Sequence, residues 1–130
     1  MQAVDSRVLE RTRRFFVDSR SIKAEPMARV EASVLDPQTA PTVKVLLVTD
    51  KFSCTEYRKR KGSIDPVHRH DDHETVGYLI SGRIRMTIGG QEFVATPGSY
   101  WVHPAGVDHS AEILEDSVSL EVKIPPTKTW

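Results

Sequence analysis

The sequence has one cysteine, no excess of either charge and no long apolar run. Because Cys54 is the only cysteine in 130 residues, no disulfide can form within the chain. The 18 Lys and Arg residues balance 18 Asp and Glu residues, which argues against the basic surface that nucleic-acid binding requires. The longest aliphatic run, residues 45–48, is far too short to cross a bilayer. We therefore expect a soluble, cytoplasmic protein with neither nucleic-acid nor membrane partners.

Helical periodicity is also missing after residue 27, where strand and turn signals dominate. We expect residues 1–26 to form an arginine-rich N-terminal arm that packs through Phe15 and Phe16 over the rest of the chain or over a neighbouring subunit. Residues 27–130 are expected to form one β-barrel domain. Its first strand is predicted around residues 30–34, because Val30, Ala32 and Val34 alternate with polar residues.

Further strands and turns follow at close spacing. Apolar residues alternate with polar ones over residues 84–88, Gly89-Gly90 follows, and residues 92–96 are able to pair back as a hairpin. Residues 118–122 alternate in the same way and predict a last strand. Many short strands at this spacing are typical of a sandwich or a closed barrel.

Two features invite a chemical interpretation that the strand pattern does not favour. Cys54 lies in a patterned stretch, residues 52–57, where a lone cysteine is expected to be a small buried hydrophobic residue rather than a nucleophile. The basic run of residues 58–61 resembles a phosphate site. On a strand, however, its four side chains must point to both faces, so we interpret the run as a solvated hairpin end.

All five histidines lie in two short segments, residues 62–82 and 98–109. On a strand, His68 and His70 would project to the same face, about 7 Å apart, and aim two imidazoles at a common point. Imidazole suits zinc, iron, nickel and copper. Several imidazoles on an inward face would otherwise need partners, or burial would lower their pKa. A shared metal satisfies them all.

These two segments resemble the paired motifs of the cupin superfamily. The residues that match the first motif, with one residue more than usual before the closing glycine, are Gly62, His68, His70, Glu74 and Gly82. Those that match the second are Gly98, Pro104, Gly106 and His109, while the asparagine often found four residues later is Ile113. The resemblance covers residues 43–124. It implies an all-β fold, the double-stranded β-helix or jelly-roll barrel of cupins.

The resemblance also implies that one divalent metal is bound by His68, His70 and His109. The fourth ligand is open, because counting from His70 gives Glu74 and counting from Gly82 gives Thr75, a poor ligand. If Thr75 faces inward, strand parity places His73 inward and Glu74 outward, so His73 is favoured. A bulge at residues 71–72 would reverse this choice. We expect zinc, with iron, nickel or manganese as alternatives.

Within the superfamily, the run from His68 to Gly82 looks most like small bacterial cupins, and among them we favour the aromatic polyketide cyclases of the resistomycin and tetracenomycin type. This resemblance implies a metal-dependent aldol-type cyclisation and aromatisation of a poly-β-ketone in antibiotic biosynthesis, with His109 essential. Glu74, His103 or a metal-bound hydroxide would accept the proton. The side chains expected to line the substrate pocket are Met86, Trp101 and His103.

Other functions remain compatible with the same residues. One is an iron-dependent dioxygenase, which would use the same ligands and bind oxygen at the open positions. Another is a non-catalytic protein that holds a small metabolite on the metal. We also expect a homodimer, because cupin barrels often pair through their sheets.

Overall fold

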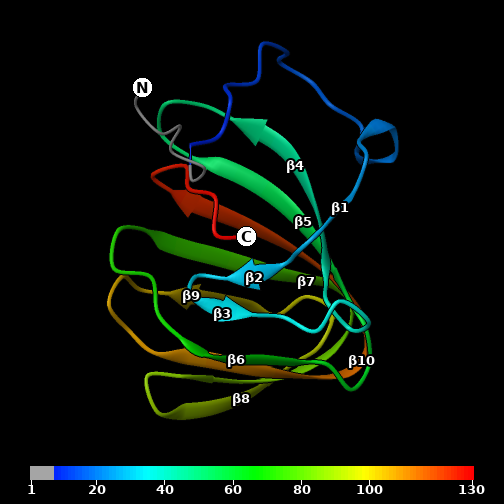
Figure 1. The fold of residues 1–130 in the computed structure, drawn as a ribbon, viewed down its shortest axis with the longest axis vertical. Coiled ribbons are helices and arrows are strands. Elements are labelled where there is room, and N and C mark those ends of the chain that lie inside the picture. The colour runs from blue at the N-terminus through cyan, green and yellow to red at the C-terminus, as the bar shows by residue number, and fades with distance from the viewer. Residues whose placement is uncertain (1–7) are drawn as a thin grey trace.

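The structure is a computed structural model and describes residues 8–130. The only helical element in this range is the short 3-10 turn η1 (Ser19–Ser21). The strands are β1 (Glu25–Pro26), β2 (Arg29–Val30), β3 (Ser33–Val34), β4 (Thr42–Val48), β5 (Ser53–Lys59), β6 (Ile64–His68), β7 (Glu74–Ile88), β8 (Gln91–Ala95), β9 (Tyr100–His103) and β10 (His109–Ile124) (Figure 1). All pairs are antiparallel, which confirms the predicted all-β fold. Within residues 8–130, no helix has the length and apolar character needed to span a membrane.

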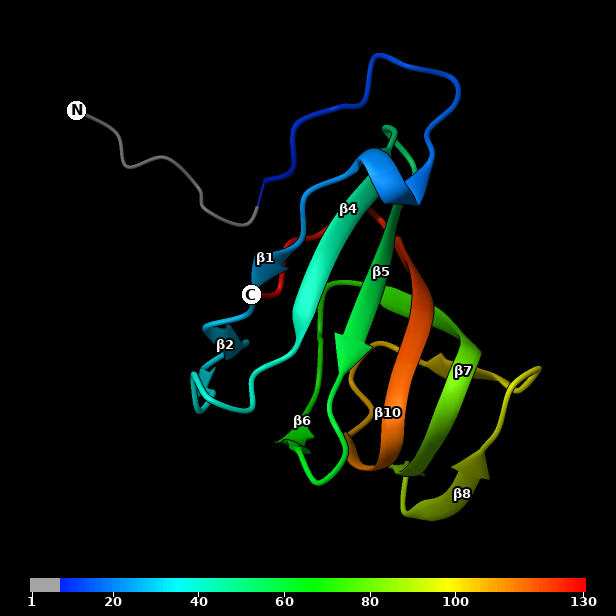
Figure 2. The ribbon, with the colours of Figure 1, turned by 90° about the vertical axis from the view of Figure 1, so that its right-hand side faces the viewer.

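The barrel is built on two long strands, β7 and β10, that bend together. The first half of β7 pairs with the second half of β10, and these halves lie between β9 and β5. Their other halves pair with each other and lie between β8 and β6. Figures 1 and 2 show how the sheet folds over on itself at this bend. The result is the jelly-roll barrel that the two motifs imply.

The bend has a local cause in the β7–β10 ladder. Its register shifts between Ile113 and Ser119, opposite Gly82. Gly82 has a φ of +97°, a conformation that other residues avoid, and a Cβ there would lie 2.2 Å from the Ser117 hydroxyl. Bulges of this kind bend a strand and increase its twist. The closing glycine of the first motif is therefore the corner of the barrel.

The predicted hairpin is confirmed. Ile88 pairs with Gln91 across Gly89 and Gly90, whose φ values are +57° and +80°. Positive φ at both central residues is the two-residue turn that matches the twist of antiparallel strands.

The strand predicted around residues 30–34 is wrong. The chain turns at Glu31, where φ is +51°, so β2 and β3 form a small hairpin of their own. Val30 is buried, whereas Val34 is exposed. The Glu31 N–H donates a hydrogen bond to the carbonyl of Thr129 (3.0 Å). Because this partner comes from the far end of the chain, the local alternation of residues cannot reveal the turn.

The arm is attached to the barrel by polar contacts rather than by its phenylalanines. Thr12 and Val48 exchange two hydrogen bonds of 2.8 and 2.9 Å, and the Lys44 ammonium donates to the carbonyl of Ser19 (2.9 Å). Phe15 and Phe16 are both exposed, so within this chain they do not anchor the arm as predicted.

The inner face of the barrel is polar on its last strand. Residues 118–122 do form a strand, as their alternation predicts, but the buried side chains of β10 include Ser117, Ser119 and Lys123. The core residues instead form two apolar clusters, which consist of Met27, Val30, Leu35, Val43 and Tyr57, and of Leu79, Ile84, Met86, Ala95 and Ile113. A polar face is tolerated inside the barrel because part of it lines a cavity and does not pack against apolar core residues.

Candidate metal centre

Three histidines from both motifs converge on one point. His68 ends β6, His109 begins β10, and the two residues are partners in the β6–β10 ladder. His70 follows two residues after β6, and its carbonyl accepts a hydrogen bond from the Gly106 N–H (2.8 Å). The turn of the second motif thus holds the loop of the first motif. One ring nitrogen from each of the three histidines lies within 4.8 Å of the other two.

Backbone carbonyls fix the protonation of two of these rings. The Nδ1 atom of His68 donates to the carbonyl of Pro66 (2.6 Å), and that of His109 donates to the carbonyl of Val107 (3.3 Å). A carbonyl only accepts, so the neutral form of each ring has its proton on Nδ1, and Nε2 is then a bare acceptor. The two Nε2 atoms lie 3.0 Å apart. Two lone pairs at this distance repel each other, and a shared metal cation would satisfy both.

The third ring is oriented by a carboxylate. The Nδ1 atom of His70 lies 2.5 Å from Oε1 of Glu31, at the turn between β2 and β3. Metal-binding histidines usually donate their second ring N–H to a carboxylate or carbonyl, which fixes the ring and its tautomer. The chemistry of the donor set therefore fits a divalent metal held by three Nε2 atoms.

The protonation state of two of the histidines also suits a metal. Burial lowers the pKa of His70, against the opposing effect of Glu31. Burial, with His68 and His70 as neighbours, lowers the pKa of His109 to about 4. These rings are consequently neutral near pH 7, the form in which imidazole binds metal.

His73 and Glu74 lie on opposite faces of the chain, as strand parity predicts. His73 and Thr75 are buried, and Glu74 is exposed at the start of β7. His73 lies beside His70, with ring centroids 4.5 Å apart, and its Nδ1 bonds to Asp72 (2.8 Å). Its buried Nε2 has no hydrogen-bond partner in the described range. His73 is not one of the three converging ligands, and its role as the fourth ligand stays a prediction.

The three residues predicted to share a pocket are separated. His103 stacks on His109, with ring centroids 3.7 Å apart and planes 6° from parallel, and lines a cavity beside the three histidines. Burial lowers the pKa of His103 to about 3. Met86 and Trp101 line a second cavity, together with residues of β8 and β9. Met86 lies beyond the bend of β7 at Gly82, which carries it to the other part of the barrel.

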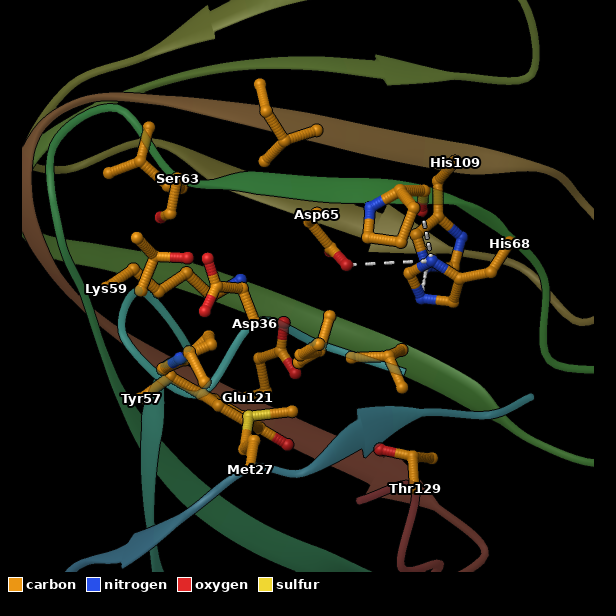
Figure 3. Close-up of a pocket in the computed structure, with 18 of the residues that line it drawn as sticks. Met27, Asp36, Tyr57, Lys59, Ser63, Asp65, His68, His109, Glu121 and Thr129 are labelled. Carbon is orange, nitrogen blue, oxygen red and sulfur yellow. Dashed lines mark hydrogen bonds and ion pairs between the residues drawn. The ribbon is translucent and has the colours of Figure 1, made fainter. Parts of the chain in front are cut away.

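The cavity beside the histidines has a volume of about 390 Å³. The N-terminal hairpin contributes apolar side chains to its wall, among them Met27, Val30 and Leu35. Figure 3 shows His68 and His109 at one end and Tyr57 and Lys59 at the other. Pockets of 300 to 1,000 Å³ with largely apolar walls are typical of small-molecule sites.

A buried ionic cluster lies away from His68 and His109, although Lys123 acts electrostatically on His73 and Glu121 on His103. The ammonium group of Lys123, 1% exposed, donates to the hydroxyl of Tyr57 (2.7 Å) and to Oε2 of Glu121 (3.2 Å). Burial alone would raise the pKa of Glu121, but Lys123 and Lys59 lower it to about 2. Burial likewise opposes the charge on Lys123, yet Tyr57 and Glu121 raise its pKa overall. Both members of the Glu121–Lys123 pair are therefore charged.

Sequence reasoning missed Glu31, which orients His70, and four polar side chains that line the cavity, Tyr57, Lys59, Glu121 and Lys123. For Lys59 a signal existed. Ser53, Thr55 and Tyr57 are buried on β5, and Lys59 continues the same face into the cavity, whereas Arg58 is exposed. The basic run is thus not wholly solvated, because one of its side chains points inward.

Comparisons with known proteins agree with this geometry. The Cupin domain family matches residues 57–122. No curated protein matches the chain. One similar solved structure is an RmlC-like cupin from Shewanella frigidimarina, with a TM-score of 0.72, 20% identity, and coverage of 86% of this chain and 91% of that chain. A predicted oxalate decarboxylase from Thermotoga maritima has a TM-score of 0.72, 19% identity, and coverage of 85% and 99%.

A third similar structure is KdgF from Halomonas sp., with a TM-score of 0.63, 24% identity, and coverage of 65% of this chain and 80% of that chain. At these identities the likeness concerns the fold alone.

Proposed function

The chain belongs to the Cupin domain family, and from this premise we propose that it is a metal-dependent enzyme that closes a ring in a poly-β-ketone. The observation that carries the proposal is the convergence of His68, His70 and His109 at one end of a cavity. The three rings bring no ligand charge, so a divalent ion would keep its full Lewis acidity. Zinc is favoured, since three imidazoles with an open position are a frequent catalytic zinc site.

The metal would supply one kind of chemistry. Bound by the three Nε2 atoms, it would polarise paired carbonyl oxygens and so acidify the carbon between them. A 1,3-dicarbonyl unit offers such a pair, and a poly-β-ketone repeats it along the chain. The cavity wall supports this class of substrate, because Met27, Val30 and Leu35 present an apolar surface that would fold the carbon chain and exclude water.

A proton acceptor lies on the same wall. Asp65 lines the cavity, and its Oδ1 is buried without a hydrogen-bond partner in the described range, 3.7 Å from Nδ1 of His68. Carboxylates are common general bases when they lie within reach of the proton. Glu74, predicted for this role, is exposed on the opposite face of the chain. We therefore assign proton acceptance to Asp65.

The reaction is testable with a simple substrate, nonane-2,4,6,8-tetraone. The carbon between its first two carbonyls loses a proton and forms a bond to the last carbonyl carbon, whose oxygen takes up a proton. The resulting hydroxyl group then leaves with a second proton as water, and enolisation of the ring gives 2,4-dihydroxy-6-methylacetophenone. We expect the zinc-loaded protein to form this product, and the His109→Ala variant to lose both zinc and turnover. The Asp65→Asn variant should keep its zinc and slow by about 10² to 10⁴-fold.

Three outcomes would overturn the proposal. Turnover that survives loss of the metal would exclude Lewis-acid chemistry. Oxygen consumption by the iron-loaded protein, with cleavage of the tetraone, would identify a dioxygenase instead. Tight zinc binding and tetraone binding without any product would identify a binding protein.

A further inference from the structure

Lys59 is a half-buried cation on the cavity wall that lacks a hydrogen-bonded anion among the described residues. Its side chain lies on the inner face of β5 and lines the cavity wall. Its ammonium group makes none of the hydrogen bonds or ion pairs formed among residues 8–130. The nearest recorded contact is the face of the Tyr57 ring, whose centroid is 5.7 Å away. Glu121 attracts this ammonium group, since Lys59 helps to lower the pKa of Glu121, but the three hydrogens of the ammonium group are left to donate to a bound anion.

Within the described part of the chain, no other charged group at this end of the cavity forms a hydrogen bond or ion pair with Lys59. Lys123 binds both Tyr57 and Glu121, so the Glu121 carboxylate already has a hydrogen-bonded cation. Together these three ionic side chains, Lys59, Lys123 and Glu121, leave one positive charge. Asp36 also lines the cavity, but it is exposed at the rim and its Oδ1 accepts from the Gln38 N–H (2.9 Å). Asp65 lies beside His68, near the opposite end.

The cavity is therefore bipolar. One end presents three imidazole nitrogens that would bind a metal. Figure 3 places Lys59, whose ammonium group has no hydrogen-bonded anion within residues 8–130, at the end away from His68 and His109. A single ammonium group balances the charge of one carboxylate, whereas a doubly charged phosphate would leave one negative charge uncompensated at this end of the cavity. The apolar side chains of the N-terminal hairpin would contact whatever carbon chain joins the two ends.

We propose that Lys59 is a carboxylate-binding residue and that the substrate is a β-dicarbonyl acid, with its dicarbonyl unit at the histidines and its carboxylate at Lys59. This inference rests on the proposed function for the dicarbonyl end only. It adds a substrate class, the free acid, that neither motif of the sequence indicates.

The test compares two ligands that differ in the carboxylate. Isothermal titration of the zinc-loaded protein at neutral pH would use 4,6-dioxoheptanoate, which has a β-diketone and a carboxylate, and heptane-2,4-dione, which has the diketone alone. We expect the wild type to bind the acid about tenfold or more tightly than the dione, as a charge-assisted hydrogen bond in a buried site would require. Lys59→Met should remove this preference and leave the affinity for the dione unchanged.

Matched variants separate the subsite from general effects. Lys59→Arg keeps the charge and should keep most of the preference, and Lys59→Gln repeats the neutral substitution if the methionine variant does not fold. Lys61→Met removes an exposed lysine from the same basic run and should bind both ligands as the wild type does. Zinc content and thermal unfolding of each variant show that the metal end and the fold are intact.

The results distinguish this inference from the proposed function. Equal affinity of the wild type for both ligands, or a preference that survives Lys59→Met and Lys59→Gln, overturns the carboxylate subsite while zinc-dependent dione binding still supports the function. Acid binding that depends on Lys59 but not on zinc supports the subsite and contradicts the function. Absence of binding for both ligands contradicts both.

Discussion

The Nε2 atoms of His68 and His109 face each other at 3.0 Å, and in the neutral form of both rings neither atom carries a proton to donate. In each ring, Nδ1 donates a hydrogen bond to a backbone carbonyl. A divalent cation that accepts both lone pairs would remove the repulsion between the two Nε2 atoms. The backbone carbonyls of Pro66 and Val107 therefore orient the two rings, with Nε2 of each ring toward the other.

The first prediction concerns pH. The pKa of His109 in the folded protein is about 4, and that of His70 is also lowered, whereas in the unfolded chain both are near 6.5. Below pH 6.5 the unfolded state therefore binds more protons, so the stability of the metal-free protein is greatest above pH 6.5 and decreases as the pH falls toward 4. Urea midpoints measured from pH 7.5 to 4.5 should fall steadily.

Zinc addition and the His109→Gln variant are the controls for this dependence of stability on pH. Zinc binds the neutral rings of the folded state, so it should raise the midpoints and delay their fall to lower pH. The His109→Gln variant should show a shallower profile than the metal-free wild type. A metal-free profile that is flat from pH 7 to 5 would contradict the account.

The second prediction concerns Glu31. Its carboxylate bonds to Nδ1 of His70 and so directs Nε2 of that ring toward the site. Glu31→Gln should weaken zinc binding by about 10 to 100-fold, the usual effect of losing such a partner. Competition with a chelator of known affinity measures the change. Glu115→Gln, at an exposed position on β10, is the matched control, and equal weakening in both variants would exclude a specific role for Glu31.

Much of the fold and the three converging histidines of the candidate metal site follow from the sequence. Histidine spacing, strand parity and turn glycines are local properties, and they correctly predict the all-β barrel, the Gly89-Gly90 hairpin and the inward face of His73. The motifs name His68, His70 and His109, which the structure brings together.

The second half of the site depends on contacts between distant segments. Glu31 reaches His70 only because the chain turns at residue 31, and that turn is held by Thr129. Lys123 meets Tyr57 across the β5–β10 pairing, 66 residues apart in sequence. The alternation on β10 marks a strand but does not say which face is buried, and here the polar face is the inner one.

The third prediction concerns the buried Glu121–Lys123 pair. Glu121→Gln removes the negative charge and leaves the buried Lys123 ammonium group with neutral partners only, the Tyr57 hydroxyl and the new amide oxygen. Removing one member of such a pair typically lowers the free energy of unfolding by about 3–5 kcal/mol. Urea denaturation measures this loss. The double variant Glu121→Gln, Lys123→Met removes the unpaired charge and should recover part of the loss; a double variant less stable than the single one would contradict this explanation.

The fourth prediction concerns Gly77, which lies under the indole of Trp101. A Cβ at Gly77 would lie 2.0 Å from the Trp101 ring, so Gly77→Ala must displace the indole. We expect a loss of about 1–3 kcal/mol in the free energy of unfolding, the usual cost of overpacking. Measured in a Trp130→Phe background, the fluorescence of Trp101 should shift toward that of a more exposed indole. An unchanged spectrum with unchanged stability would show that the contact is not as tight as described.

The central claim is that the histidines of the two motifs form one metal site, and metal content tests it most directly. Elemental analysis of the protein purified without added metal should find about one equivalent of a divalent transition metal, zinc by preference. His109→Ala should lose it, and Glu74→Ala should retain it, because Glu74 is exposed on the opposite face of the chain. His73→Ala reports in the same measurement on the fourth ligand. Full metal content in His109→Ala, or none in the wild type even after incubation with zinc, would contradict the account.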